Sequence, residues 1–262
     1  MTDTTTTAAP NPIMTQVLSE PAVTLAPALA ADLPATPAVM STPAVLHILN
    51  RINYAVKRKS PFCLVAGQQG IGKSTSCKLY GATNPRAVLL EVPPEFNARE
   101  IVGRLCEVLS IDAGEAWRVR TSVLIAHLRD HPRTVLLDEA HRLDYKALDM
   151  LKYIADQSSV TFVLFGHPHL ERVIDRHSDI KGRVWVRANP LPIPAADLLS
   201  LYKPHGYSGQ TLRVVHDATG GIMRSVVVLL EHLDEGLKSM PGLTRADLTP
   251  DHVRRVKDEV LA

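Results

Sequence analysis

The segment LVAGQQGIGKSTSCKLY (64–80) has the residue types and spacing of a phosphate-binding loop, because Gly67 to Ser74 fits G-x-x-x-x-G-K-[ST]. Its glycines let the backbone turn tightly and aim N–H groups inward. Lys73 can reach the β- and γ-phosphates of a nucleotide, and the Ser74 hydroxyl can ligate Mg²⁺. The predicted nucleotide-binding residues are Gly67, Gln68, Gln69, Gly70, Ile71, Gly72, Lys73, Ser74 and Thr75.

A pair of carboxylates in VLLDEAH (135–141) supplies what hydrolysis requires beyond binding. Asp138 closes an apolar run, where it can hold Mg²⁺ through water, and Glu139 can polarise the attacking water. We therefore expect ATP and Mg²⁺ as cofactors, with hydrolysis to ADP and phosphate. The alternative for Glu139 is a surface carboxylate at a strand end. The letters DEAH also spell a helicase motif, but such helicases need two nucleotide-fold domains, for which the chain has no room.

Polar side chains later in the chain are candidates to sense the γ-phosphate. His167 follows the apolar run TFVLFG (161–166), and a polar residue at that strand tip can lie between the loop and the carboxylates. The alternatives are a loop histidine or His169 in the same role. Arg224 stands just inside a predicted helix, where its cation can fold over the γ-phosphate and couple domain closure to the nucleotide. An ordinary helix-start arginine is the other interpretation.

Four arginines follow the fourth apolar run, at 172, 176, 183 and 187. An arginine supplied by a neighbouring subunit can stabilise the charge of a phosphoryl-transfer transition state. Arg183 is our first choice for this role and Arg176 the second. Taken singly, each is better explained by a solvated surface charge.

Apolar runs alternate with helical patterns, which predicts a parallel sheet covered on both faces, the α/β class of the P-loop NTPases. The expected strands are 62–67, 87–92, 134–140, 161–166 and 184–188, and the expected helices are 42–57, 73–80, 98–109, 115–129 and 145–155. After Pro194 the strand pattern stops and four helices are expected, at 195–203, 210–218, 224–238 and 250–261. The predicted domains are a disordered Ala/Thr/Pro-rich tail (1–41), a nucleotide-binding α/β domain (42–193) and a small helical lid (194–262).

Composition narrows the class of protein. The net charge is +2, and because residues 1–41 contribute −3, residues 42–262 carry +5, which suits a phosphate-backbone partner. No apolar run is long enough to span a bilayer, and no Lys or Arg precedes Arg51, so we expect a cytoplasmic protein without a membrane partner. Cys63, Cys77 and Cys106 have no metal-like spacing and are expected to be reduced, buried thiols.

Together these segments resemble the AAA+ ATPases of the transposition-helper group, which includes MuB, TnsC and TniB and is related to ExeA-type ATPases. The resemblance rests on the loop, LLDEAH, VLFGHPHLERVI, KGRVWVRANPL and TGGIMRSVVVLLEHL, and covers residues 43–260. It implies that Lys73 and Ser74 are the Walker A pair, that Asp138 and Glu139 are the Walker B pair, and that His167 and Arg224 are the two sensors. Met223 departs from the family pattern, which has proline there.

The resemblance further implies ATP-dependent filaments or rings on double-stranded DNA, without sequence specificity, that select target DNA for a DDE transposase and activate it. An arginine offered to the next subunit's ATP implies a head-to-tail homo-oligomer. Candidate contacts to the DNA backbone are Lys57, Arg58, Lys59, Arg99, Arg104, Arg118, Arg120, Lys146 and Lys152, each of which also fits a solvated face.

Three other functions stay open from the sequence. A helicase loader or other protein-remodelling ATPase would have the same ATP site. A small-molecule P-loop kinase would transfer phosphate to a metabolite, and a scaffold would bind nucleotide without turnover.

Overall fold

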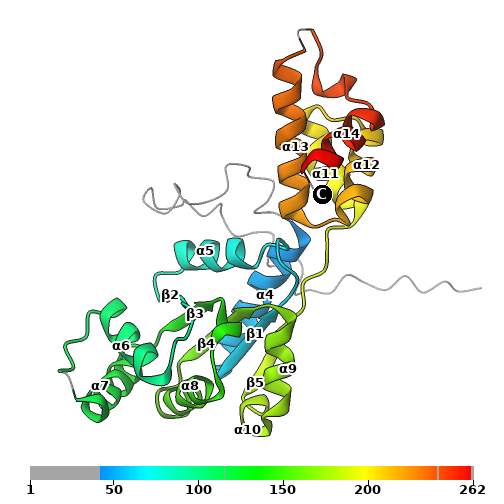
Figure 1. Ribbon diagram of the computed structural model, residues 1–262. Helices are drawn as coiled ribbons and strands as arrows, with labels where there is room; N and C mark the ends of the chain where they lie inside the picture. Colours follow the sequence, from blue (N-terminus) through cyan, green and yellow to red (C-terminus); the bar gives the residue numbers. More distant parts are fainter. Residues whose placement is uncertain (1–41, 115, 241, 261–262) are drawn as a thin grey trace, which may run out of the picture.

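A computed structural model describes residues 42–114, 116–240 and 242–260 of the chain (Figure 1). The disordered tail predicted for 1–41 lies outside these residues. The described chain contains one sheet of five strands: β1 (Phe62–Ala66), β2 (Ala87–Glu91), β3 (Thr134–Asp138), β4 (Thr161–Gly166) and β5 (Val184–Ala188). Their order is β2-β3-β4-β1-β5 and every pairing is parallel, which confirms the predicted sheet.

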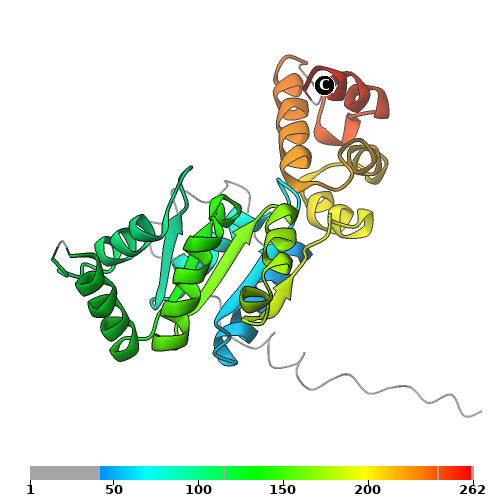
Figure 2. The ribbon, with the colours of Figure 1, turned by 60° about the horizontal axis from the view of Figure 1, so that its bottom comes forward.

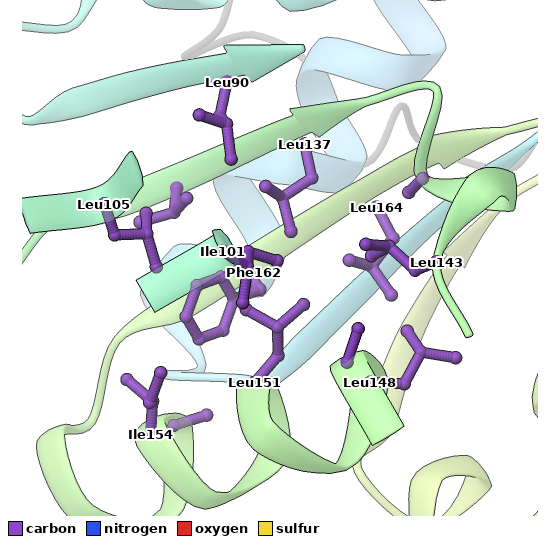
Figure 3. Packing of buried hydrophobic residues seen from close by; sticks show 14 of the residues in the cluster. Leu90, Ile101, Leu105, Leu137, Leu143, Leu148, Leu151, Ile154, Phe162 and Leu164 are labelled. Carbon is purple, nitrogen blue, oxygen red and sulfur yellow. The ribbon is translucent and has the colours of Figure 1, made fainter. Parts of the chain in front are cut away.

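Helices cover both faces of the sheet. Residues of β1 alternate between the faces, so that Phe62 and Leu64 join one buried cluster while Cys63 and Val65 join another. The helices on the first face are α6 (Ala98–Val108), α7 (Trp117–Asp130), α8 (Tyr145–Ser158), α9 (Pro168–Arg176) and α10 (Ser178–Lys181), and those on the second are α4 (Pro43–Lys57) and α5 (Lys73–Thr83). Figure 3 shows leucines and isoleucines of α6 and α8 packed against β2, β3 and β4.

Local sequence signals explain where several helices begin. Thr42 caps α4, because its hydroxyl accepts the Val45 amide at 3.3 Å, and Pro43 occupies the first turn, as predicted. Asn97 and Glu100 form a capping box at the start of α6. Asp144 caps α8 by accepting the Ala147 amide at 2.7 Å.

The residues after β5 form a helical region with its own buried cluster (Figure 2). Its helices are α11 (Ala195–Tyr202), α12 (Gly209–Thr219), α13 (Met223–Lys238) and α14 (Pro250–Val260), close to the four expected. Asp234 on α13 ties the region together, because it accepts hydrogen bonds from the Tyr207 hydroxyl at 2.7 Å and from Arg245 Nε at 2.8 Å. In both views the region stands beyond the end of the sheet where α13 meets the loop after β1.

The structure bears on the state of the cysteines and on a membrane span. The three cysteines are free and buried, and burial raises the pKa of Cys63 to about 12, so that its thiol stays protonated. None of the helices in the described part of the chain has the length and hydropathy needed to cross a bilayer.

Candidate active site

The phosphate-binding loop connects β1 to α5 at the carboxyl end of the sheet. Two of its glycines have left-handed backbone angles, with φ of 78° at Gly70 and 105° at Gly72. A Cβ at Gly70 would lie 2.7 Å from Arg224 Cβ, and one at Gly72 would lie 3.0 Å from Val45 Cγ2. The loop therefore requires glycine twice, for its backbone angles and for the close approach of neighbours.

Lys73 turns its side chain into this loop. Its ammonium donates to the carbonyls of Gly67 and Gln68, both at 2.8 Å. Burial lowers the pKa of Lys73, while the charges of Glu139 and Asp138 oppose that shift. The cation is thus held inside the loop and faces the two carboxylates of β3.

The two carboxylates stand at the end of β3 and line the same cavity. β4 separates β3 from β1, and the amide of Glu139 donates to Asp138 Oδ1 at 3.0 Å. Glu139 has a φ of 56°, a left-handed conformation that non-glycine residues rarely adopt. This turn ends the strand at Asp138, two residues before the predicted end at 140, and leads into the 3₁₀ helix η1 (Ala140–Arg142).

η1 contributes two side chains for which no role was predicted, His141 and Arg142. His141 Nδ1 lies 3.2 Å from Glu139 Oε2, although without the angles of a hydrogen bond. Arg142 donates to the carbonyl of Val92 at 2.7 Å, and both residues line the same cavity as the carboxylates. His141 stood inside the quoted DEAH segment, but its approach to Glu139 depends on the turn that follows β3.

The two candidate sensor histidines both reach the cavity. His167 follows β4 and caps α9, where its Nδ1 accepts the His169 amide at 3.4 Å. Gly166 before it packs closely, since a Cβ there would lie 2.7 Å from Leu170 Cδ2. Position therefore does not separate His167 from His169, because both line the cavity.

α13 closes the cavity from the helical region. The amide of Arg224 donates to the Gly70 carbonyl at 3.0 Å, and Arg224 itself is exposed. The resulting cavity has a volume of about 680 Å³. Its lining residues are Gln69, Gly70, Gly72, Lys73, Ser74, Thr75, Asp138, Glu139, His141, Arg142, Gly166, His167, His169, Met223, Arg224, Val227 and Val228. Three predicted loop residues, Gly67, Gln68 and Ile71, are not among the lining residues, and the first two instead present carbonyls to Lys73.

The candidate trans arginines lie away from this cavity. The Arg183 carbonyl accepts the Phe62 amide at 3.1 Å, at the amino end of β1, whereas the loop follows its carboxyl end. Five residues at about 3.3 Å each place these two ends roughly 16 Å apart. Arg183 is also held by Asp156, with hydrogen bonds of 2.7 and 2.9 Å, and exposed Arg176 ends α9.

The arrangement fits a nucleoside triphosphate with a divalent metal. The glycine turns and the first turn of α5 present amides to an anion, and Lys73 adds a cation. Ser74 and Asp138 would hold the metal, whose chemistry would be to neutralise charge on the phosphates. Glu139 lines the same cavity, and its charge acts on Lys73.

One protein family and several solved structures are similar to this chain. Residues 56–174 match the AAA domain family. The chain has the AAA+ P-loop fold. None of the curated protein sequences matches the chain.

Solved structures with the AAA+ fold are similar over most of the chain. Cdc6p from Pyrobaculum aerophilum is 18% identical, with a TM-score of 0.65, over 91% of this chain and 72% of its own. The ORC2 protein of Aeropyrum pernix, solved as ADPNP-ADP complexes, is 14% identical, with a TM-score of 0.63, over 87% and 69%. The ORC1 protein of Aeropyrum pernix, solved in complex with DNA, is 15% identical, with a TM-score of 0.58, over 80% and 64%. At these identities the likeness establishes the AAA+ fold.

Proposed function

We propose that the chain is an ATP-dependent DNA-binding AAA+ ATPase that assembles head to tail on duplex DNA without sequence specificity. In that state it selects target DNA for a DDE transposase and activates the enzyme. The observation that carries the proposal is the contact between Arg224 and Gly70, which joins the helical region to the phosphate loop at 3.0 Å. Nucleotide held in the cavity would touch both parts, so its presence would set their relative position.

Each site residue has a distinct task in this proposal. Lys73 and the loop amides bind the phosphates, while Ser74 and Asp138 hold Mg²⁺. Glu139 orients and polarises water, which is the step that turns a binding site into a hydrolytic one. His167, at the tip of β4, senses whether the γ-phosphate is present. Arg224 couples loss of the γ-phosphate to movement of α13.

Head-to-tail assembly follows from where the remaining arginines lie. The backbone of Arg183 lies beside the amino end of β1, which is the end opposite the phosphate loop. Arg176 is the last residue of α9, whose first residue follows the carboxyl end of β4. Neither can serve its own subunit's phosphates, but either can serve those of a neighbour. Such a contact joins two different surfaces and closes into a ring or continues as a filament. To reach the neighbouring subunit's site, Arg183 would have to break its ion pair with Asp156.

Duplex DNA is the proposed track for this assembly. The charge of +5 over residues 42–262 supports a backbone partner, and the similar ORC1 structure was solved in complex with DNA. Backbone contacts carry no base information, so two unrelated duplexes should bind equally well.

The alternative is an AAA+ helicase loader or other protein-remodelling ATPase. In that function the same contact between Arg224 and Gly70 would couple the nucleotide to the remodelling of a partner protein. Fluorescence anisotropy with two unrelated 40-base-pair duplexes separates the two functions. The proposal predicts binding of both duplexes with ATP and weaker binding with ADP, and affinities for the two sequences that agree within about twofold. Absence of DNA binding with every nucleotide would favour the remodelling ATPase.

A further inference from the structure

A second cavity opens at the amino edge of the sheet, opposite the candidate active site. It has a volume of about 530 Å³ and is lined by the first residues of three strands, Ala87, Thr134 and Thr161. Because the strands are parallel, this edge lies a full strand length from the phosphate loop, roughly 16 Å for five residues. The two cavities are therefore separate sites.

The charged side chains that line this cavity are all cations. Lys59, Arg86 and Arg133 line it together with the hydroxyl-bearing residues Tyr80 and Ser159, and no carboxylate is among its lining residues. Over the described part of the chain, none of the three cations forms an ion pair. This lining suits an anionic group that accepts several hydrogen bonds.

Arg133 carries the clearest sign of unmet bonding capacity. Its Nη1 donates to the Pro85 carbonyl at 3.3 Å, but its Nε is buried and has no hydrogen-bond partner among the described residues. A buried donor without a partner is costly unless another group meets it. That nitrogen is closed to the cavity, so an oxygen-rich anion there would meet the terminal nitrogens Nη1 and Nη2, which make one hydrogen bond between them among the described residues.

The dipoles of nearby helices explain only part of this arrangement. α4 ends at Lys57 and its partial negative charge favours cations close by, which accounts for Lys57 and Lys59. Arg86 and Arg133 each follow a helix end by three residues, after α5 and α7, and directly precede β2 and β3. Three helix ends therefore favour cations at this edge, but they leave most of the donor capacity of these side chains to another group.

Ion pairs distinguish two of the other candidate phosphate contacts from the cations at this edge. Arg104 pairs with Glu107, and Lys152 pairs with both Asp149 and Asp179. By contrast, exposed Lys57 and Lys59 stand at the same edge as Arg86 and Arg133. A group of cations near one cavity, without carboxylate partners, is the footprint expected for phosphate.

We propose that the cavity at the amino edge binds phosphate groups through Lys59, Arg86 and Arg133, at a site independent of the nucleotide cavity. Two sources share this chemistry: the backbone of duplex DNA and a free polyphosphate compound. Only the DNA source rests on the proposed function. The experiment treats the two sources as separate titrations.

The test variant is a double substitution that spares the fold, Lys59→Gly with Arg86→Ala. Lys59 has a φ of 52°, which glycine adopts without strain, and Arg86 is exposed. The matched control is Arg213→Ala with Lys238→Ala, which removes the same charge from two exposed positions on α12 and α13. Circular dichroism melting of the wild type and both variants checks that folding is equal.

Duplex DNA and inorganic tripolyphosphate are each titrated into the three proteins. If the source is DNA, the test variant binds duplex about tenfold more weakly, with a salt slope reduced by roughly two, while the control changes less than about twofold. If the source is a free polyphosphate, the same loss occurs with tripolyphosphate. The phosphate loop contributes equally to all three proteins, so a difference reports the amino-edge cavity.

Losses in the test variant that do not exceed those of the control in either titration would overturn the proposal. Wild-type protein that fails to bind DNA would instead count against the proposed function. The tripolyphosphate titration would then decide this site alone.

Discussion

The amide of Arg224 donates to the carbonyl of Gly70 at 3.0 Å, which joins residues 154 positions apart in the sequence. The contact fixes the first turn of α13 against the phosphate loop, and the Arg224 side chain borders the same cavity as Lys73 and Glu139. A change in the loop on nucleotide binding would therefore be felt directly by the helical region. The predictions below test this coupling and the chemistry assigned to the cavity.

Replacing Gly70 by alanine should disturb the contact selectively. The new methyl group would lie 2.7 Å from Arg224 Cβ, in a left-handed conformation with a φ of 78°. Gly114→Ala is the matched control, since its φ is 63° but no atom lies within 4 Å of the added Cβ. Backbone strain should lower the free energy of unfolding by about 1–2 kcal/mol in both variants. Only Gly70→Ala should also weaken nucleotide binding, by tenfold or more in a fluorescent-ADP titration, and equal affinities would refute the coupling.

Glu139→Gln should separate nucleotide binding from hydrolysis. The amide keeps the shape of the side chain but cannot act as a base, so turnover should fall about a hundredfold or more. Nucleotide affinity should change little, and the assembled state should persist longer with ATP. Phosphate release and ADP affinity, measured on the same preparation, check both parts. If the unmodified chain shows no turnover with DNA present, the protein is a nucleotide-stabilised scaffold and the assignment of catalysis is wrong.

His141→Ala tests whether the histidine positions Glu139. Because His141 Nδ1 lies 3.2 Å from Glu139 Oε2, its removal should let the carboxylate move and lower kcat about tenfold, within the range of general-base effects. KM for ATP should stay within about twofold, since His141 is not part of the phosphate loop. His232→Ala, at an exposed position of α13, is the control and should leave kcat unchanged. An unaffected kcat in His141→Ala would remove the residue from the mechanism.

Mixing two inactive variants tests whether Arg183 acts in trans. Arg183→Ala keeps Glu139, and Glu139→Gln keeps Arg183, so a neighbouring pair can rebuild one complete site. Random head-to-tail mixing at equal amounts should restore about a quarter of the sites. Arg176→Ala, mixed in the same way, tests the second choice. A mixture with no activity above that of its separate components would show that neither arginine completes a neighbour's site.

The sequence predicted the sheet well because buried parallel strands are short apolar runs, and the observed strands agree with the runs to within two residues. β3 ends earlier than expected because Glu139 adopts a left-handed conformation that no propensity indicates. No helix was predicted at 168–181, where the structure has α9 and α10. Pro168 after His167 is nevertheless a typical helix start.

The site was predictable where its residues are consecutive and unpredictable where the fold brings them together. Lys73, Asp138 and Glu139 follow from local motifs next to strand ends. The approach of His141 to Glu139 depends on η1, and the pairing of Arg183 with Asp156 depends on how β5 meets α8. The docking of Arg224 on Gly70 requires the whole helical region in place. Arg86 and Arg133 did not stand out, because each is a single cation until the sheet sets them around one cavity.

In the proposed function, nucleotide bound in the cavity builds an assembly on duplex DNA. Negative-stain electron microscopy of the full chain with double-stranded DNA, in the presence of ATP or of ADP, tests it most directly. We expect regular filaments or rings on the DNA with ATP, fewer or none with ADP, and stabilised assemblies for Glu139→Gln with ATP. Bare DNA in every condition, with a chain that still binds ATP, would contradict it.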